Sequence, residues 1–184
     1  MSRSQLARAI YDASHLEGEF LLRSGALATE YFDKYLFESD PELLVTIAEA
    51  LVPLVPGDTE ALAGLELGGV PLAVVLGQIT GLPVLFVRKK AKEYGTRRLA
   101  EGGDVSGKRL LIVEDVVTSG GQVVLSTRDL RALGAVIDSA ICVIDREAGG
   151  ADALAREGVA LAALFTMGEL ASAASGSRLT SPSR

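Results

Sequence analysis

Residues 110–121 have the sequence LLIVEDVVTSGG, and their order of apolar, acidic and small residues decides the fold class. The uninterrupted apolar run from Leu110 to Val113 is typical of a strand buried on both faces, which occurs mostly in parallel sheets. Two carboxylates, two apolar residues and two hydroxyl residues follow, and then Gly120 and Gly121 lead into helical periodicity. We therefore predict a strand, a short polar turn and a helix, which is the repeating unit of α/β proteins.

The same alternation of short apolar runs and helical segments extends on both sides of this stretch, from residue 60 onward. It predicts an α/β fold with a central, mainly parallel sheet flanked by helices. The expected strands cover residues 61–65, 83–87, 109–114, 136–144 and 159–165, and the expected helices cover 69–79, 120–133, 151–157 and 167–174. Residues 89–107 are polar and contain glycine, so we expect a loop there.

The first 60 residues show a different pattern. We expect a helix over 4–14, a short apolar run over 20–22 and a strand over 31–36, where apolar and polar residues alternate. Asp40 and Pro41 predict the start of another helix that reaches residue 51, because aspartate caps helix N-termini and proline fits the first turn.

The overall composition restricts the functions that this chain can have. Its 184 residues carry 18 Lys and Arg against 24 Asp and Glu, and the net charge of −6 argues against a general nucleic-acid-binding protein. One cysteine and one histidine cannot form an intrachain disulfide or a zinc site of thiolates and imidazoles, and they fit a reducing, cytoplasmic location. Glycine and proline punctuate the uncharged stretch 67–87, so we interpret it as a buried helix, turn and strand rather than a membrane span.

The turn at residues 118–121 has the chemistry of a phosphate site. In open α/β sheets, ligands bind beyond the carboxyl ends of the strands. Thr118 to Gly121 lie at such an end, where small residues expose backbone N–H groups and a helix N-terminus attracts an anion. Glu114 and Asp115 would repel that phosphate, but they suit the hydroxyl groups of a sugar or a divalent metal. A ribose 5-phosphate would fit both the phosphate-binding turn and the two carboxylates. The alternative is a strand–turn–helix junction with polar residues at its tip.

This stretch also resembles the motif with which type I phosphoribosyltransferases bind phosphoribosyl diphosphate (PRPP), two acids before a T-S-G-G loop. The resemblance implies the type I phosphoribosyltransferase fold, with a small N-terminal hood over residues 1–40, a core over 41–174 and a flexible tail over 175–184. It implies a catalytic role for Glu114 and Asp115, which would hold the ribose. The loop would bind PRPP through Val116, Val117, Thr118, Ser119, Gly120 and Gly121.

A second motif is the basic segment 88–98, which holds six of the 18 basic residues and only one acid. It follows an expected strand at the sheet edge where ligands bind, and its charge suits a pyrophosphate. The segment resembles the signature of the orotate enzymes of this family at Arg88, Lys89, Lys92 and Gly95. The resemblance implies that Arg88 and Lys89 bind PRPP, and that catalytic Lys92 lies on a loop, 92–104, that closes over the neighbouring subunit's site. A solvated basic loop is the alternative.

Two further stretches of sequence concern the binding of the base that would accept the phosphoribosyl group. Residues 145–149, DREAG, resemble the element from which Arg146 would hold orotate, and a guanidinium fork fits the carboxylate and the neighbouring carbonyl of that ring. The N-terminal FLLRSG and the aromatic pair after it resemble the hood of the orotate enzymes. That resemblance implies orotate contacts from Arg23, Tyr31 and Phe32, together with Thr118. A surface ion pair for Arg146 and core packing for the aromatic pair stay open.

The Gly-rich turn in residues 63–71, AGLELGGVP, can lay backbone N–H groups against pyrophosphate. Leu67 and Gly68 stand where some relatives have a Tyr-Lys pair, so this contact must rely on the backbone and on the basic segment. Close packing of a helix on a strand explains Gly69 equally well.

Together these resemblances imply an orotate phosphoribosyltransferase, which converts orotate and PRPP to orotidine 5′-monophosphate and pyrophosphate in pyrimidine (UMP) biosynthesis. They imply Mg²⁺ as cofactor, held mainly by PRPP and water rather than by protein ligands, and a cytoplasmic homodimer without nucleic-acid or membrane partners. The alternatives are a uracil or purine phosphoribosyltransferase, or a PRPP-binding regulator without turnover. Residues 1–60 show neither a basic face nor a helix-turn-helix, which disfavours the regulator.

Overall fold

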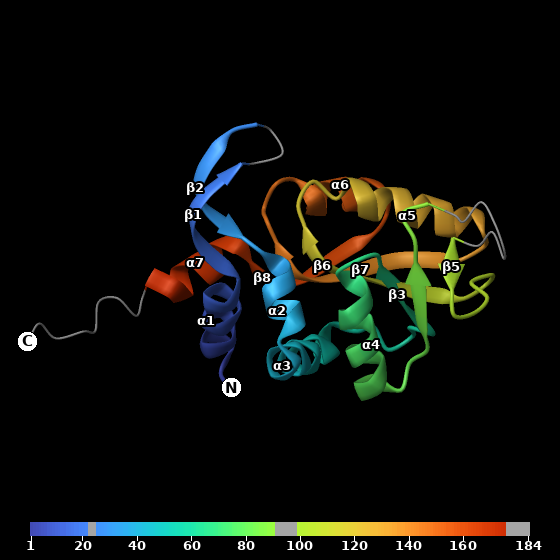
Figure 1. The fold of residues 1–184 in the computed structure, drawn as a ribbon. Helices are drawn as coiled ribbons and strands as arrows, with labels where there is room; N and C mark the ends of the chain where they lie inside the picture. Colours follow the sequence, from blue (N-terminus) through green and yellow to red (C-terminus); the bar gives the residue numbers. More distant parts are fainter. Residues whose placement is uncertain (22–24, 91–98, 176–184) are drawn as a thin grey trace, which may run out of the picture.

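The computed structural model describes residues 1–21, 25–90 and 99–175, and its centre is a sheet with helices on both faces (Figure 1). In the described part of the chain, six strands form this sheet in the order β5-β4-β3-β6-β7-β8. The strands are β3 (Ala61–Leu65), β4 (Val84–Val87), β5 (Ala100–Glu101), β6 (Arg109–Val117), β7 (Val136–Asp145) and β8 (Ala160–Thr166). All neighbours pair in parallel except β4 and β5, so the predicted α/β class with a mainly parallel sheet is confirmed.

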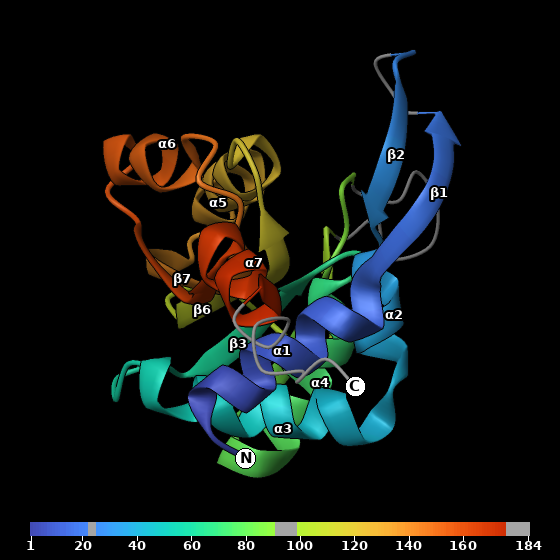
Figure 2. The ribbon, with the colours of Figure 1, turned by 90° about the vertical axis from the view of Figure 1, so that its left-hand side faces the viewer.

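The apolar run of β6 serves two cores because neighbouring strand residues point to opposite faces. Leu111 and Val113 pack in the core beneath the sheet, with α1 (Arg3–Ser14), α3 (Pro41–Leu51), α4 (Gly69–Thr80) and α7 (Met167–Ser175). Leu110 and Ile112 pack in the core above it, with α5 (Gly121–Ala132) and α6 (Gly150–Arg156). Figure 2 shows these two helical layers on opposite sides of the sheet.

The predicted helix at Pro41 is confirmed, and its cap forms as expected: the Asp40 side chain accepts hydrogen bonds from the backbone N–H groups of Glu42 and Leu43. The uncharged stretch 67–87 forms α4, a turn at Gly81 and β4, as predicted. Within the described residues, no helix is long and apolar enough to cross a membrane.

Three predicted elements need correction. The strand expected over 31–36 is wrong, because β2 (Leu27–Phe32) ends earlier and α2 (Lys34–Ser39) begins after it. The reason is Asp33, whose side chain accepts a hydrogen bond from the Tyr35 N–H and caps the new helix. β6 runs to Val117 rather than ending at 114, because Val116 and Val117 still pair with β7. Within the expected loop 89–107 lies the short strand β5; residues 91–98 are outside the described part.

The N-terminal segment contributes both to the core and to a projecting hairpin. Leu6 and Ile10 of α1 are buried in the lower core. The chain then forms the antiparallel pair β1 (His15–Leu21) and β2, which stands away from the sheet on the side of the β6 and β7 ends (Figures 1 and 2). This position brings the hairpin over the edge of the sheet where a ligand would bind.

Candidate active site

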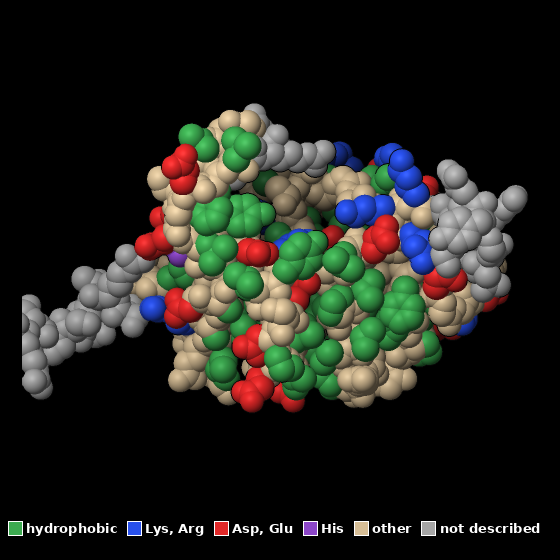
Figure 3. Space-filling view, viewed as in Figure 1, with side chains coloured by type: hydrophobic (Ala, Val, Ile, Leu, Met, Phe, Trp, Pro, Cys, Tyr) green, Lys and Arg blue, Asp and Glu red, His purple; other side chains and the backbone are tan. Residues whose placement is uncertain are grey.

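The candidate site lies at the carboxyl ends of four parallel strands. Leu65 of β3 pairs with Val87 of β4, and Val117 of β6 pairs with Asp145 of β7, so these strands end at one edge. Since β3 also pairs with β6, the loops that leave all four strands are neighbours. This is the edge at which α/β sheets bind their ligands. Figure 3 shows a hollow at this edge with Lys and Arg side chains on its rim.

The loop after β6 forms a small cavity of about 160 Å³, lined by Glu114 and by residues 116–123. Thr118 and Ser119 are exposed there, and α5 begins directly behind them with no side-chain cap. Gly120 has φ +75°, and a Cβ on it would lie 2.7 Å from the Leu154 Cδ1 atom. Glycine is therefore required for the turn and for the close approach of α6. The free N–H groups at the start of α5 are suited to a phosphate.

The two adjacent acids of β6 have different surroundings. Asp115 is completely buried; its Oδ1 accepts a hydrogen bond of 2.6 Å from the Val116 N–H, and its Oδ2 lies 2.5 Å from Lys34 Nζ. Glu114 lines the phosphate cavity, and its Oε2 has no hydrogen-bond partner among the described residues. Burial and the neighbouring Asp115 raise the pKa of Glu114 to about 8. Of the two predicted ribose ligands, the structure brings only Glu114 to the cavity wall.

Two residues of α2 complete the buried acid cluster: Lys34 and Glu38, neither of which the sequence analysis selected. Burial opposes the charge of Lys34, but its hydrogen bond and ion pair with Asp115 raise its pKa above the ordinary value. Burial and then Asp115 raise the pKa of Glu38 to about 9. The sequence signal for this pair is its four-residue spacing, which puts both side chains on one face of a helix. The strand expected over 31–36 hides that signal.

The turn between β3 and α4 rests directly on this cluster. A Cβ on Gly68 would lie 1.7 Å from the Asp115 Oδ2 atom and 2.6 Å from the Glu38 Oε1 atom. A Cβ on Gly69 would lie 2.2 Å from the Val113 carbonyl oxygen. Both glycines are therefore needed for packing, whatever ligand the turn binds.

The basic segment is tied to the same turn. The Lys89 backbone N–H donates a 2.6 Å hydrogen bond to Glu66 Oε1, and the charge of Lys89 acts on Glu114 to favour its ionised form. Arg88 Nε lies 3.7 Å from Glu101 Oε1 in β5. Of the predicted residues, Lys89 therefore acts on Glu114 and Arg88 pairs with Glu101 of the edge strand, whereas Lys92 is outside the described residues.

A second cavity, of about 280 Å³, lies between the hairpin and the loop after β7. It is lined by Tyr11, His15, Glu30, Tyr31, Phe32, Arg146, Met167 and Ala171. The structure thus brings together Tyr31, Phe32 and Arg146, which the sequence analysis selected from separate motifs. The Arg146 N–H donates a 2.9 Å hydrogen bond to the Val117 carbonyl, which fixes this loop against the phosphate loop. Thr118 lies on the phosphate cavity instead, and Arg23 is outside the described residues.

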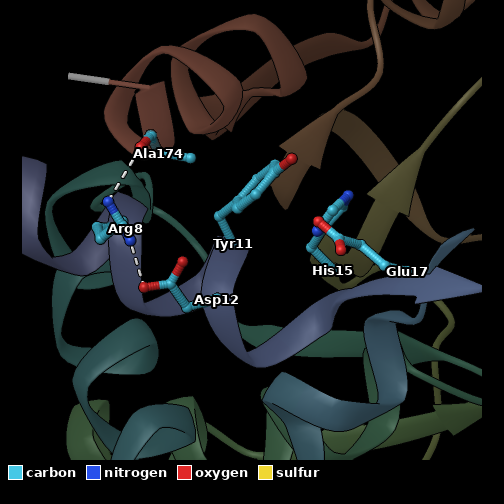
Figure 4. Close-up of a pocket in the computed structure, with 6 residues that line it drawn as sticks. All are labelled: Arg8, Tyr11, Asp12, His15, Glu17 and Ala174. Atoms are coloured by element: carbon cyan, nitrogen blue, oxygen red, sulfur yellow. Dashed lines mark hydrogen bonds and ion pairs between the residues drawn. The ribbon is translucent and has the colours of Figure 1, made fainter. Parts of the chain in front are cut away.

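His15 is a cavity residue to which the sequence analysis gave no role in the site. Its ring stacks on Tyr11 with centroids 4.8 Å apart, and its Nε2 lies 3.3 Å from Glu30 Oε2. The same two rings also border a polar cavity of about 370 Å³ beside α1, together with Arg8, Asp12, Glu17 and Ala174 (Figure 4). There Arg8 is engaged by Asp12 at 2.5 Å and by the Ala174 carbonyl at 3.0 Å.

Comparisons with known proteins point to one family. A model of the phosphoribosyl transferase domain matches residues 25–159. The orotate phosphoribosyltransferase of a Nocardioides strain is 53% identical over 165 residues, which cover 90% of this chain and 92% of that protein. The orotate phosphoribosyltransferase of Methanocella arvoryzae is 42% identical over 153 residues, covering 83% and 87%.

Solved structures show the same similarity. The orotate phosphoribosyltransferase of Mycobacterium tuberculosis H37Rv in complex with inorganic phosphate superposes with a TM-score of 0.82 at 27% identity, covering 92% of this chain and 98% of that chain. The structure of the same enzyme in complex with PRPP gives a TM-score of 0.79 at 26% identity, with coverage of 92% and 98%.

Proposed function

Because the chain belongs to the phosphoribosyltransferase family, we propose that it transfers the phosphoribosyl group of PRPP to orotate. The products are orotidine 5′-monophosphate and pyrophosphate, in the pathway of pyrimidine (UMP) biosynthesis. One observation carries the choice of orotate: Arg146 and the aromatic pair Tyr31 and Phe32 line one cavity, next to the phosphate loop. An exposed guanidinium beside aromatic rings suits a flat base that bears a carboxylate.

Binding of PRPP would use the loops at the four strand ends. The N–H groups of residues 118–121 would hold the 5-phosphate, and the neighbouring Glu114 would hold the ribose hydroxyls. Because the pKa of Glu114 is raised to about 8, this carboxyl group is largely neutral at pH 7 and does not repel the phosphate. Arg88, Lys89 and the backbone of the turn at Gly68 would receive the diphosphate.

The reaction breaks the bond between ribose C1 and the diphosphate oxygen and forms a bond from C1 to the orotate ring nitrogen. The ring nitrogen gives up its proton as the bond to C1 forms, and the leaving pyrophosphate is a base that can accept it. Negative charge grows on the leaving pyrophosphate. Arg88, Lys89 and Lys92 would stabilise it electrostatically, with Lys92 supplied by loop 92–104. Closure of that loop would exclude water, which would otherwise hydrolyse PRPP.

Mg²⁺ is part of this proposal as the companion of PRPP. The described carboxyl groups fit an ion carried by the substrate better than a protein cage, because Asp115 is buried and already paired with Lys34. When bound, Mg²⁺ supplies positive charge to the diphosphate. We also propose that the enzyme is a cytoplasmic homodimer.

A substrate panel tests the proposal. The purified protein is supplied with PRPP and Mg²⁺ and offered orotate, uracil, hypoxanthine or adenine separately. We expect pyrophosphate release only with orotate, accompanied by loss of orotate absorbance. Turnover with uracil or a purine instead would assign a different base, and PRPP binding without any turnover would indicate a regulator.

A further inference from the structure

An acid cluster lies beneath the turn at Gly68, and the proposed chemistry does not use it directly. Lys34 and Glu38 lie one turn apart on α2 and approach Asp115 at the end of β6. The Asp115 side chain is 1% exposed and that of Lys34 is 32% exposed. The ion pair therefore points inward from the rim of the site and away from solvent.

The cluster is balanced in charge. A buried carboxylate is stable only when a cation and hydrogen-bond donors surround it. For Asp115, the Val116 N–H donates a hydrogen bond to Oδ1, and the Lys34 ammonium forms an ion pair with Oδ2. Glu38 Oε1 has no partner in the described part of the chain, and it lies near the same point as Asp115 Oδ2. With its pKa near 9, Glu38 is protonated at pH 7 and can donate to Asp115. Lys34, Asp115 and Glu38 then carry no net charge together.

The cluster supports the backbone that would receive the diphosphate. Gly68 packs on Asp115 and Glu38 with no space for even a methyl group. Two residues earlier, Glu66 holds the Lys89 N–H. A displacement of the Asp115 carboxylate would therefore move both the glycine turn and the start of the basic segment.

We propose that Lys34 and Glu38 are positioning residues for PRPP: they hold Asp115 in place under Gly68 and thereby fix the diphosphate-binding turn. This inference rests on the proposed function, since it assigns PRPP to the site. It separates the roles of the two acids, because Glu114 faces the ligand and Asp115 supports the turn. Both positioning residues act through Asp115 and touch no substrate.

Direct binding of PRPP with Mg²⁺, measured by calorimetry without orotate, tests the inference independently of turnover. Lys34→Met removes the charge but keeps the length of the side chain. We expect it to weaken PRPP binding by about tenfold or more, because an unpaired buried carboxylate remains. The KM for orotate should change by less than about twofold. Lys34→Arg should recover part of the affinity. The matched control is Lys108→Met, at the opposite end of β6, which should bind PRPP like the wild type.

Glu38 provides a second, independent comparison. Glu38→Gln retains a neutral donor and should bind PRPP within about twofold of the wild type, whereas Glu38→Met removes the donor and should bind it about tenfold more weakly. If Lys34→Met does not fold, the comparison of the two Glu38 variants tests the inference by itself. Normal PRPP binding by folded Lys34→Met, equal weakening toward PRPP and orotate, or identical behaviour of the two Glu38 variants would overturn the inference. A wild type that binds PRPP but does not convert orotate would overturn only the proposed function.

Discussion

At the scale of single residues, Arg146 is the side chain on which the choice of base depends. Its backbone is fixed by the Val117 carbonyl, while its side chain is exposed at the cavity that Tyr31 and Phe32 also line. Arg146→Gln should therefore raise the KM for orotate by about tenfold or more and leave PRPP binding unchanged, because only the carboxylate contact is lost. Initial rates at varied orotate measure this. Arg156→Gln, an exposed arginine on α6, is the control, and an unchanged KM in Arg146→Gln would contradict the assignment.

The raised pKa of Glu38, about 9, gives a prediction for stability without ligand. A carboxyl group whose folded pKa exceeds its unfolded value stabilises the fold at low pH, and this contribution is lost as the pH rises through the folded pKa. The wild type should therefore become less stable between pH 6 and 10. Glu38→Gln cannot ionise, and it should lose at least about 1 kcal/mol less of its unfolding free energy over this interval.

Chemical denaturation at the two pH values measures this difference, with Glu49→Gln on the exposed face of α3 as the control. Equal losses in wild type and Glu38→Gln would show that Glu38 is not held in its neutral form.

The residues of the phosphate loop were predictable from sequence because they are contiguous and their chemistry is local. The partners of Asp115 could not be predicted from sequence, because Lys34 and Glu38 are far from it in the chain and become its neighbours only through the packing of α2. The burial of Asp115 was equally hidden, because β6 continues two residues past the acids and turns one side chain inward.

At the scale of elements, the sequence predicted the parallel sheet because its strands are mostly apolar and because Gly81 and Gly134 mark the ends of the helices between them. The failure over 31–36 has a local cause. Apolar and polar residues alternate there as in a strand, but Asp33 caps a short helix whose buried aromatic residue, Phe37, joins the lower core. Tertiary packing overrides a short alternating pattern in this segment.

The turn between β3 and α4 is the element whose packing can be tested most directly. Gly68 has φ −69°, so alanine is compatible with its backbone, but the Cβ would collide with Asp115 Oδ2. Gly68→Ala should therefore weaken PRPP binding and lower kcat/KM by at least about tenfold. Gly57→Ala, where no atom of the described residues lies within 4 Å of the added Cβ, should behave like the wild type. Full activity of Gly68→Ala would show that the turn is not held against the acids as described.

At the scale of the whole molecule, the net charge of −6 conceals a strongly uneven distribution. On the face shown in Figure 3, Asp and Glu side chains occur at several separate places, while most of the visible Lys and Arg side chains gather at the rim of the hollow between hairpin and α5. Such a molecule repels extended polyanions but can concentrate a small one at the hollow. The sequence alone located this basic segment. It could not show which acids the segment faces, because that depends on the order of the strands, which places β4 two strands from β6.

The proposed homodimer predicts that two inactive variants restore each other. Lys92→Ala removes the loop lysine, and Glu114→Ala removes the ribose contact, so each variant alone should have very low kcat. If Lys92 serves the neighbouring subunit, a mixed dimer contains one complete site, built from Glu114 of one chain and Lys92 of the other. Random exchange of equal amounts should then restore roughly a quarter of the wild-type activity, because half of the dimers are mixed and half of their sites are complete. Rates after mixing and subunit exchange measure this, with each variant mixed with itself as the control. If both variants are dimeric and no activity returns, Lys92 acts within its own chain.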